Sequence, residues 1–442
     1  MIKIYMRQAW TLIKQNKLYS SIYIIGTGLS VALIMVVFII YYIKFAPIYP
    51  EYNRDKTMVM KIISIKMKNE VIANALSYHW GHDLIPKMKG VKDVAMINQG
   101  SGYINDKLIV MPKGKENVTV RPMYVNDGFW RVFTFDFISG RPFTDADERA
   151  QRNKAVISES LAKKVFGSAD VVGRYLENNG LRYEVAGVVK DVSAATPTTY
   201  ADIWMVIPKS EGAESDNMSL TLGSIDVGKL RMLGNYNCYM TVKEDKDKAI
   251  LKDEITQYAK NLSLQYKKDS ISLELRGQPD TYVENCLRTY SSDPVDYKTQ
   301  ITNFLVMMFA LMFVPALNLC GMISSRMDGR MSEMGIRKAF GARRKTLLSQ
   351  ILWENIILTA VGALLGLLMS YVIMVAASDW ILQIFDMFGG NYSTHITFEM
   401  LFNPIIVGIA VVVCFVLNLV SAILPAALSL RHNIINSINS KS

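Results

Sequence analysis

Four apolar segments, one near the N-terminus and three near the C-terminus, constrain this chain more than any other feature. They cover residues 20–43, 301–323, 352–377 and 404–428, and a polar block, 44–300, separates the first from the others. A helix needs about 20 apolar residues to cross the hydrocarbon core of a bilayer. Helices also satisfy their own backbone hydrogen bonds in lipid. The sequence therefore predicts a membrane α-helical protein with four transmembrane helices, one plus three, and one large domain outside the bilayer.

The alternative for the first segment is a cleavable signal peptide. Its apolar stretch is longer than the roughly 7–15 residues of a signal core. The sequence that follows, Lys44-Phe45-Ala46-Pro47, offers no small-x-small cleavage site. We therefore expect 20–43 to be retained as a membrane helix.

The distribution of basic residues predicts the orientation of the chain. Basic residues concentrate before the first helix, between the second and third, and after the fourth. They are Lys3, Arg7, Lys14 and Lys17, then Arg326, Arg330, Arg337, Lys338, Arg343, Arg344 and Lys345, and finally Arg431 and Lys441. Because positive charge is retained in the cytoplasm, residues 1–19, 324–350 and 429–442 are expected there. The block 44–300 and the loop 379–403, which has no Lys or Arg, are expected on the periplasmic or extracellular side of the inner (cytoplasmic) membrane.

The net charge of +10 is explained by this topology, so we expect no nucleic-acid partner. Apart from Glu354 near one end of the third helix, the four spans contain no ionisable acid or base. Charges inside membrane helices usually mark ion or proton pathways. A carrier driven by protons or sodium is therefore disfavoured.

The block 44–300 has a mixed α+β pattern with an inserted, β-rich middle part at about 121–208. The flanking parts each predict a strand, a helix and a strand. These elements are expected at 58–65, 75–88 and 91–97, and again at 239–242, 246–266 and 271–275. Two such units around an insert predict a split αβ sandwich of ferredoxin-like character.

Within the insert, 183–189 alternates as a strand does. Residues 158–166 predict a short helix that Ser158 caps and Gly167 ends.

The block carries little sign of catalytic or metal chemistry. His79 and His82 could share a helix face with Asp83, but the further ligands of a metal site are not evident, and solvent-exposed imidazoles are the simpler interpretation. A second acidic group, Asp145, Asp147 and Glu148, is typical of a helix start. We therefore expect a binding or coupling domain with no catalytic residues and no metal.

Two cysteines of the block leave a question open. Cys238 and Cys286 could form a disulfide in an oxidising compartment or remain separate thiols. Sequence alone does not place their Cα atoms.

Several segments of the block together resemble a known family. They are Val125-Asn126-Asp127-Gly128-Phe129-Trp130, Gly140-Arg141-Pro142-Phe143-Thr144, Ala155-Val156-Ile157-Ser158-Glu159, Phe166-Gly167, Val172-Gly173-Arg174 and Val185-Ala186-Gly187-Val188-Val189-Lys190-Asp191. This pattern is similar to the periplasmic core domain of MacB-like permeases, which are membrane subunits of ABC transporters. Pro279-Asp280-Thr281-Tyr282 resembles the closing segment of that domain. The resemblance implies a porter part that is split in sequence, with a second subdomain inserted.

The loop 324–350 contains a second motif. It reads Glu333-Met334-Gly335-Ile336-Arg337-Lys338-Ala339-Phe340-Gly341-Ala342. It is similar to the segment of FtsX-like permeases that docks on the ATPase subunit. In that role Gly335 would allow close approach, Ile336 would bury apolar surface, and the charged residues would form charge-assisted contacts. Gly341 is expected to end this helix before the third membrane helix starts near Arg343. The alternative is a basic loop that only orients the helices.

The chain has no Gly-x-x-x-x-Gly-Lys-Ser/Thr phosphate loop. The resemblance therefore implies that a separate cytoplasmic ATPase binds ATP and Mg²⁺, and that this chain is not itself an enzyme. It also implies mechanotransmission, in which the membrane helices carry the ATPase cycle to the outer domain. The work done there would be efflux of a peptide or drug, lipoprotein release or control of a cell-wall hydrolase.

The resemblance further implies partners besides the ATPase and the lipid bilayer. A second copy or a sister permease is expected, because four helices form a poor pore, and an adaptor, lipoprotein or hydrolase could bind outside. Gly362 and Gly366 form a Gly-x-x-x-Gly pair that allows close helix packing. The alternative function is a membrane-anchored ligand sensor or scaffold without an ATPase.

Overall fold

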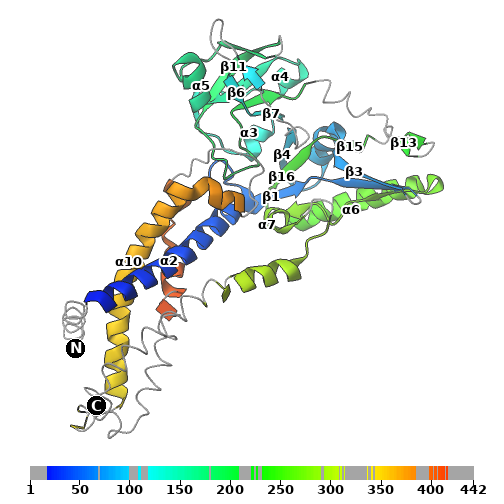
Figure 1. Ribbon diagram of the computed structural model, residues 1–442. Helices are drawn as coiled ribbons and strands as arrows, with labels where there is room; N and C mark the ends of the chain where they lie inside the picture. Colours follow the sequence, from blue (N-terminus) through cyan, green and yellow to red (C-terminus); the bar gives the residue numbers. More distant parts are fainter. Residues whose placement is uncertain are drawn as a thin grey trace. The chain divides into compact units, whose positions relative to one another are not determined.

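The chain forms two compact units (Figure 1). One is the head domain, Lys44–Tyr297, and the other is the helical unit, made of Met1–Ile43 and Lys298–Ser442. The computed structural model describes residues 17–67, 70–98, 108–110, 118–178, 181–208, 221–222, 225–226, 231–289, 293–307, 309–310, 313, 336, 340–341, 344–384, 398–401, 403–405, 407–413 and 415–416.

Two helices of the helical unit are long and apolar enough to cross a membrane. The first span, Ser20–Phe45, lies in α2 (Lys17–Phe45), and the second, Ile356–Ser378, lies in α10 (Arg344–Ile384). The third predicted helix, 352–377, lies within α10 and ends at a kink, because Ala377 has a non-helical backbone (φ −122°, ψ 18°). A second helical segment follows the kink and ends at Ile384. The first residues of the predicted outer loop are consequently helical.

The other two predicted spans are only partly described. Residues 297–307 are helical, as are 407–413. The remainder of 301–323 and of 404–428 lies largely outside the described residues.

The head domain is built on an antiparallel sheet that its two strand–helix–strand units share. Strand β16 (Asn237–Val242) pairs with β4 (Val91–Asn98) on one side and with β1 (Thr57–Met60) on the other. Strand β18 (Asp280–Thr281) pairs with the free edge of β1. A strand of the second unit thus lies between the two strands of the first. This interleaved order agrees with the predicted split αβ sandwich.

A second sheet continues from the first. Strand β2 (Ile63–Met67) follows β1 after two residues and pairs with β3 (Glu70–Leu76) and with β17 (Ile271–Glu274). Helix α6 (Asp247–Gln265) buries one stripe of residues, namely Leu251, Ile255 and Ala259. The predicted strands 91–97, 239–242 and 271–275 and the helix 246–266 are confirmed, with bounds that differ by a few residues.

Two sequence predictions for the first strand–helix–strand unit are wrong in part. The predicted strand 58–65 is two strands, because Oε1 of Gln278 accepts hydrogen bonds from the backbone N–H groups of Lys61 (2.6 Å) and Ile62 (3.3 Å) at the break. The predicted helix 75–88 begins later, because Leu76 pairs with Tyr236 through both of its backbone groups and remains in β3. Its helical part contains a π-helical turn, η2 (Trp80–Leu84), and a 3₁₀ turn, η3 (Ile85–Lys87).

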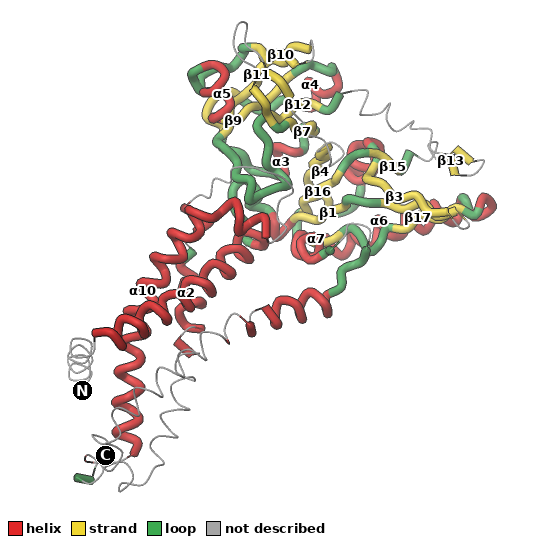
Figure 2. The backbone as a smooth tube through the Cα atoms, viewed as in Figure 1, coloured by secondary structure: helices red, strands yellow, loops and turns green. Residues whose placement is uncertain are grey.

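The inserted part (121–208) extends the main sheet (Figure 2). Its strand β7 (Pro122–Val125) pairs with β4, with Ile97 opposite Val125. Beyond β7 the order is β12 (Ile203–Val206), β9 (Lys154–Ser158), β11 (Leu181–Val189) and β10 (Tyr175–Asn178). One continuous sheet therefore joins the inserted part to the rest of the head domain, 44–120 and 209–297. This rest is called the porter part below.

Helix α5 (Glu159–Phe166) has the predicted ends. The Ser158 side chain accepts a hydrogen bond from the backbone N–H of Leu161, and Gly167 closes the helix at φ +76°. Both the cap and the left-handed glycine are local features, which is why the sequence predicted them.

The remaining elements are short. They are η1 (Arg54–Lys56), β5 (Leu108–Val110), β6 (Val118–Val120), α3 (Phe129–Val132), β8 (Phe137–Gly140), α4 (Asp145–Arg149), β13 (Thr221–Leu222), β14 (Ile225–Asp226), β15 (Leu233–Gly234), η6 (Lys267–Asp269), α7 (Tyr282–Leu287) and α11 (Phe398–Leu401).

Candidate functional site

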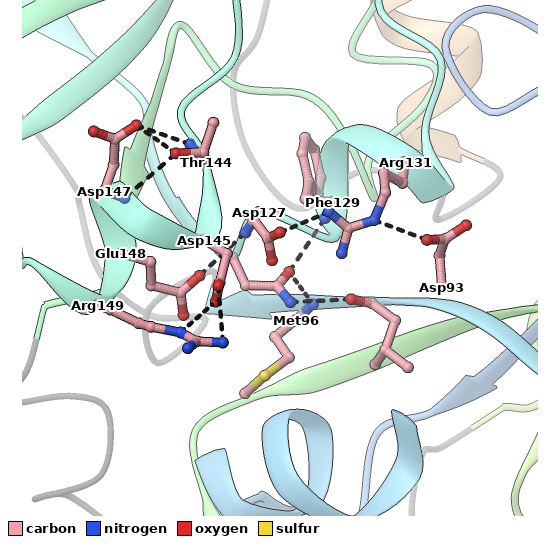
Figure 3. Close-up of polar contacts among 12 residues, drawn as sticks. Asp93, Met96, Asp127, Phe129, Arg131, Thr144, Asp145, Asp147, Glu148 and Arg149 are labelled. Carbon is pink, nitrogen blue, oxygen red and sulfur yellow. Dashed lines mark hydrogen bonds and ion pairs between the residues drawn. The ribbon is translucent and has the colours of Figure 1, made fainter. Parts of the chain in front are cut away.

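A buried amide joins the porter part to the start of α3, with hydrogen bonds from the backbones of Met96 and Phe129 (Figure 3). Oδ1 of Asn126 accepts hydrogen bonds from the backbone N–H groups of Met96 (2.8 Å) and Phe129 (3.2 Å). Its Nδ2 donates to the carbonyl oxygen of Val94 at 3.0 Å. Because Met96 and Val94 lie in β4, this single side chain fixes α3 against the sheet.

The glycine of the same motif is required by the close approach of two backbones. A Cβ on Gly128 would lie 1.9 Å from the carbonyl oxygen of Val94. No side chain fits at that distance without moving the strand. The Asn126-Asp127-Gly128-Phe129 motif therefore has a structural cause, which is the docking of α3 onto β4.

A second contact to the inserted part passes through a buried carboxylate. Glu148, in α4, is 3% exposed. Its Oε1 accepts a 2.9 Å hydrogen bond from the hydroxyl of Tyr78, and its Oε2 accepts a 3.2 Å hydrogen bond from the backbone N–H of Asp127. Burial raises the pKa of Glu148, and the two hydrogen bonds oppose this rise. Sequence reasoning identified Glu148 only as part of an acidic helix start and missed Tyr78.

The acidic helix start itself is confirmed. Thr144 caps α4, and the Asp147 side chain accepts a hydrogen bond from the backbone N–H of Thr144 in return. Burial alone would raise the pKa of Asp147, but the capping hydrogen bonds from Thr144 and the ion pair with Lys154 lower it to about 2. Nη1 of Arg152 also lies 3.1 Å from Oδ1 of Asp147. The negative charge of the Asp147 carboxylate therefore stabilises the N-terminus of α4.

The two histidines of the porter part share one carboxylate. Nδ1 of His79 lies 2.9 Å from Oδ2 of Asp83, and Nδ1 of His82 lies 2.8 Å from Oδ1. Both imidazoles are partly buried, at 27% and 34% exposed, so they are less open to solvent than the sequence suggested. The His82 ring stacks on Tyr78, with ring centroids 4.8 Å apart. Among the described residues, no group of three or more His, Cys, Asp or Glu could hold a metal ion.

Three residues of the predicted ATPase-docking segment are described. Ile336 and Phe340 are exposed, at 51% and 89%, and the backbone N–H of Phe340 donates to the carbonyl oxygen of Ile336 at 3.1 Å. Gly341 has φ +87°, which ends this turn three residues before α10 begins at Arg344. The other residues of the segment lie outside the described part of the chain. They are Glu333, Met334, Gly335, Arg337, Lys338, Ala339 and Ala342.

Gly362 and Gly366 lie where α10 packs against α2. A Cβ on Gly366 would lie 2.5 Å from the carbonyl oxygen of Gly28 and 2.6 Å from Cβ of Val31. A Cβ on Gly362 would lie 2.8 Å from Cβ of Thr27. The two glycines therefore serve a contact between two helices of the same chain.

Cys238 and Cys286 are both free thiols in the structure. Cys238 is fully buried, and burial raises the pKa of its thiol to about 12. The Cys286 thiol donates to the carbonyl oxygen of Lys44 at 3.7 Å. Of the two alternatives that the sequence left open, the structure has the separate thiols.

Comparison with protein families accounts for most of the chain. A family model described as the MacB-like periplasmic core domain matches residues 20–258. A second, described as the FtsX-like permease C-terminal domain, matches residues 305–434. The chain belongs to the MacB/FtsX-like permeases of ABC transporters.

Curated relatives agree with this assignment. An uncharacterized ABC transporter permease, YknZ, of Bacillus subtilis is 24% identical over 64% of this chain and 64% of its own length. The pyoverdine export ATP-binding/permease protein PvdT of Pseudomonas aeruginosa is 27% identical over 55% of this chain and 33% of its own. The macrolide export ATP-binding/permease protein MacB of Wolinella succinogenes is 20% identical over 64% of this chain and 42% of its own. The chain thus spans less than two thirds of the length of these relatives.

Solved structures add little to the assignment. The extracellular domain of a YknZ transporter from Gram-positive bacteria aligns at 17% identity over 48% of this chain and 99% of its own, with a TM-score of 0.29. A domain of a permease protein from Porphyromonas gingivalis aligns at 17% identity over 50% of this chain and 88% of its own, with a TM-score of 0.35.

Proposed function

We propose that this chain is a permease subunit that works by mechanotransmission with a separate cytoplasmic ATPase. The ATPase would bind ATP and Mg²⁺, and four transmembrane helices would carry its cycle to a head domain on the outer side of the inner membrane. A second copy of the chain or a sister permease would complete the membrane part. The work outside would be efflux of a peptide or drug, lipoprotein release or control of a cell-wall hydrolase.

The observation that carries the proposal is the exposed turn before α10. Ile336 and Phe340 are one helical turn apart, so both apolar side chains lie on one face of that turn. The sequence around them adds Glu333, Arg337 and Lys338. An apolar centre with charged neighbours is typical of a protein interface. Gly341 lies three residues before α10, so a displacement of the turn would pass along a short stretch of chain to a membrane helix.

Co-purification from the native host tests the proposal. Full-length chain should retain an ABC ATPase, and the double variant Ile336→Asp, Arg337→Glu should lose it. A matched control is Ile250→Asp with Arg182→Glu, which makes the same chemical changes at exposed positions of the head domain. An unchanged amount of ATPase with the docking variant would refute the docking role. Purification of the wild-type chain with no ATPase at all would favour the sensor or scaffold.

A further inference from the structure

One carboxylate of the head domain accepts hydrogen bonds from residues in three separate segments. Glu51 is 1% exposed and lies six residues after the end of α2. Its Oε2 accepts hydrogen bonds from Nε of Arg54 (2.9 Å) and from the hydroxyl of Tyr282 (2.9 Å). Its Oε1 accepts a 3.0 Å hydrogen bond from the hydroxyl of Thr199. Tyr282 starts α7, which precedes the second predicted membrane helix, and Thr199 belongs to the inserted part.

The arginine of this cluster holds the segment that leaves α2. Nη1 of Arg54 donates to the carbonyl oxygen of Ala46 at 2.5 Å, and Ala46 is the first residue after α2. The Arg54 guanidinium also lies over the Tyr282 ring, 4.8 Å from its centroid. The Arg54 side chain is 3% exposed, so the whole charge pair is removed from water. The pair therefore fixes the incoming segment and the outgoing segment against each other.

Neighbouring contacts tie the same incoming segment to the inserted part. The hydroxyl of Tyr49 donates to the carbonyl oxygen of Lys190 (3.3 Å) and accepts from the backbone N–H of Asp136 (3.2 Å). Nδ2 of Asn53 donates to the carbonyl oxygen of Val132 at 3.0 Å. Residues 46–54 thus contact the inserted part at several points.

A buried ion pair such as that of Glu51 and Arg54 adds little to the free energy of unfolding. Removing two charges from water costs about as much as their attraction returns, and apolar residues of similar size often stabilise more. What a buried carboxylate with donors from three side chains does provide is one defined geometry. A defined geometry at this position matters if movement enters the head domain through its two connections to the membrane helices.

We propose that the Glu51 carboxylate is a rigid joint that makes the two membrane connections and the inserted part move as one body. This inference rests on the proposed function, since the movement would come from the ATPase. Glu51, Arg54, Tyr282 and Thr199 are then positioning residues, which act through the geometry they maintain.

Amide hydrogen exchange of the full-length chain in lipid nanodiscs tests the joint without the ATPase. Tyr282→Phe and Thr199→Val each remove one donor and keep the side-chain volume close to the original. If Glu51 is a joint, Tyr282→Phe raises exchange about tenfold both in its own segment and in residues 193–200, whose Thr199 donates to the other oxygen of the same carboxylate. Thr199→Val does the same in residues 280–288. The effects of the two variants are then non-additive in the double variant.

The matched control is Glu274→Gln, at a carboxylate that is 38% exposed and lies 4.0 Å from Nζ of Lys66. It should leave both segments unchanged. Exchange that rises only within the substituted segment, with additive effects in the double variant, would overturn the joint. Unchanged exchange elsewhere in the head domain shows that each variant still folds.

A second experiment links the joint to the ATPase cycle. In the complex with the co-purified ATPase, trapping nucleotide with vanadate should change exchange at residues 193–200 of the wild type. Tyr282→Phe should abolish that change while ATP hydrolysis and co-purification persist, and a change that survives in Tyr282→Phe would count against the joint. If no ATPase co-purifies, the proposed function fails, but the nanodisc experiment still decides whether the joint exists.

Discussion

The hydroxyl of Tyr78 donates a 2.9 Å hydrogen bond to Oε1 of Glu148, and these residues come from different parts of the head domain. Tyr78 lies in the first strand–helix–strand unit, and Glu148 lies in α4 of the inserted part. Their contact adds a side-chain link to the sheet that already joins the two parts through β4 and β7. Because Glu148 is buried, the link depends on keeping its carboxylate fully hydrogen-bonded.

Replacing Tyr78 by Phe should therefore destabilise the head domain. The substitution leaves one oxygen of a buried carboxylate without its donor, which costs about 1–3 kcal/mol. Chemical denaturation of the full-length protein in detergent, followed by tryptophan fluorescence, would measure this loss. Tyr175→Phe is the control, since Tyr175 is 58% exposed and should cost well under 1 kcal/mol. Equal stabilities of the two variants would contradict the assigned role of Tyr78.

The stability of the head domain should depend on pH through Glu148. Burial raises its pKa in the folded state above the ordinary value of 4.5. The stability linked to this group is then fully present below about 4.5 and is lost as the pH rises through the folded-state pKa. Wild-type protein should accordingly lose stability relative to Glu148→Gln over that interval. Denaturation midpoints of both proteins between about pH 4 and pH 7 would show it, and parallel curves would speak against a raised pKa.

The parts of the fold that could be predicted from sequence have local causes. Ser158 and Gly167 define both ends of α5 through contacts within a few residues. The helix predicted at 246–266 is α6, where Leu251, Ile255 and Ala259 are buried at a spacing of four residues. Such patterns need no knowledge of distant neighbours.

The predictions that were wrong concern parts of the fold that depend on partners distant in the sequence. The break between β1 and β2 is made by Gln278, which is 217 residues away from Lys61. Leu76 stays in a strand because Tyr236 supplies its backbone partners. Likewise, the motif around Gly128 was visible in the sequence, but its cause is the carbonyl oxygen of Val94, which only the folded chain brings near. Tertiary pairing of this kind overrides local propensity.

Gly366→Ala should weaken the contact between α2 and α10. The added methyl group would meet the carbonyl oxygen of Gly28 at 2.5 Å, so one helix must move. Overpacking of this kind typically costs about 1–3 kcal/mol. Thermal unfolding of the full-length protein in detergent should show a lower midpoint.

The control for this contact is Gly408→Ala. Gly408 is also helical, but among the described residues no atom lies within 4 Å of an added Cβ. The same gain in helix propensity applies to both positions, so the difference between the two variants isolates the packing. Similar midpoints for the two variants would mean that α2 and α10 do not pack through Gly366.

Arg288 should not tolerate replacement by Lys. Its Nε and Nη2 donate to the two carboxylate oxygens of Asp280 at 2.7 and 2.6 Å, and Nη1 donates to the carbonyl oxygen of Arg276 at 3.1 Å. Both charged side chains are 4% exposed. A lysine keeps the charge but cannot match this planar geometry.

Arg288→Met leaves Asp280 buried without its cation, which should cost about 3–5 kcal/mol, and Arg288→Lys should fall between this variant and the wild type. The control is the exposed pair of Arg182 and Glu177, whose charged atoms lie 3.9 Å apart, where Arg182→Met should cost less than about 1 kcal/mol. Denaturation of each full-length variant gives the comparison. A loss for Arg288→Met no larger than that for Arg182→Met would show that the buried pair does not hold the segment before the second predicted membrane helix.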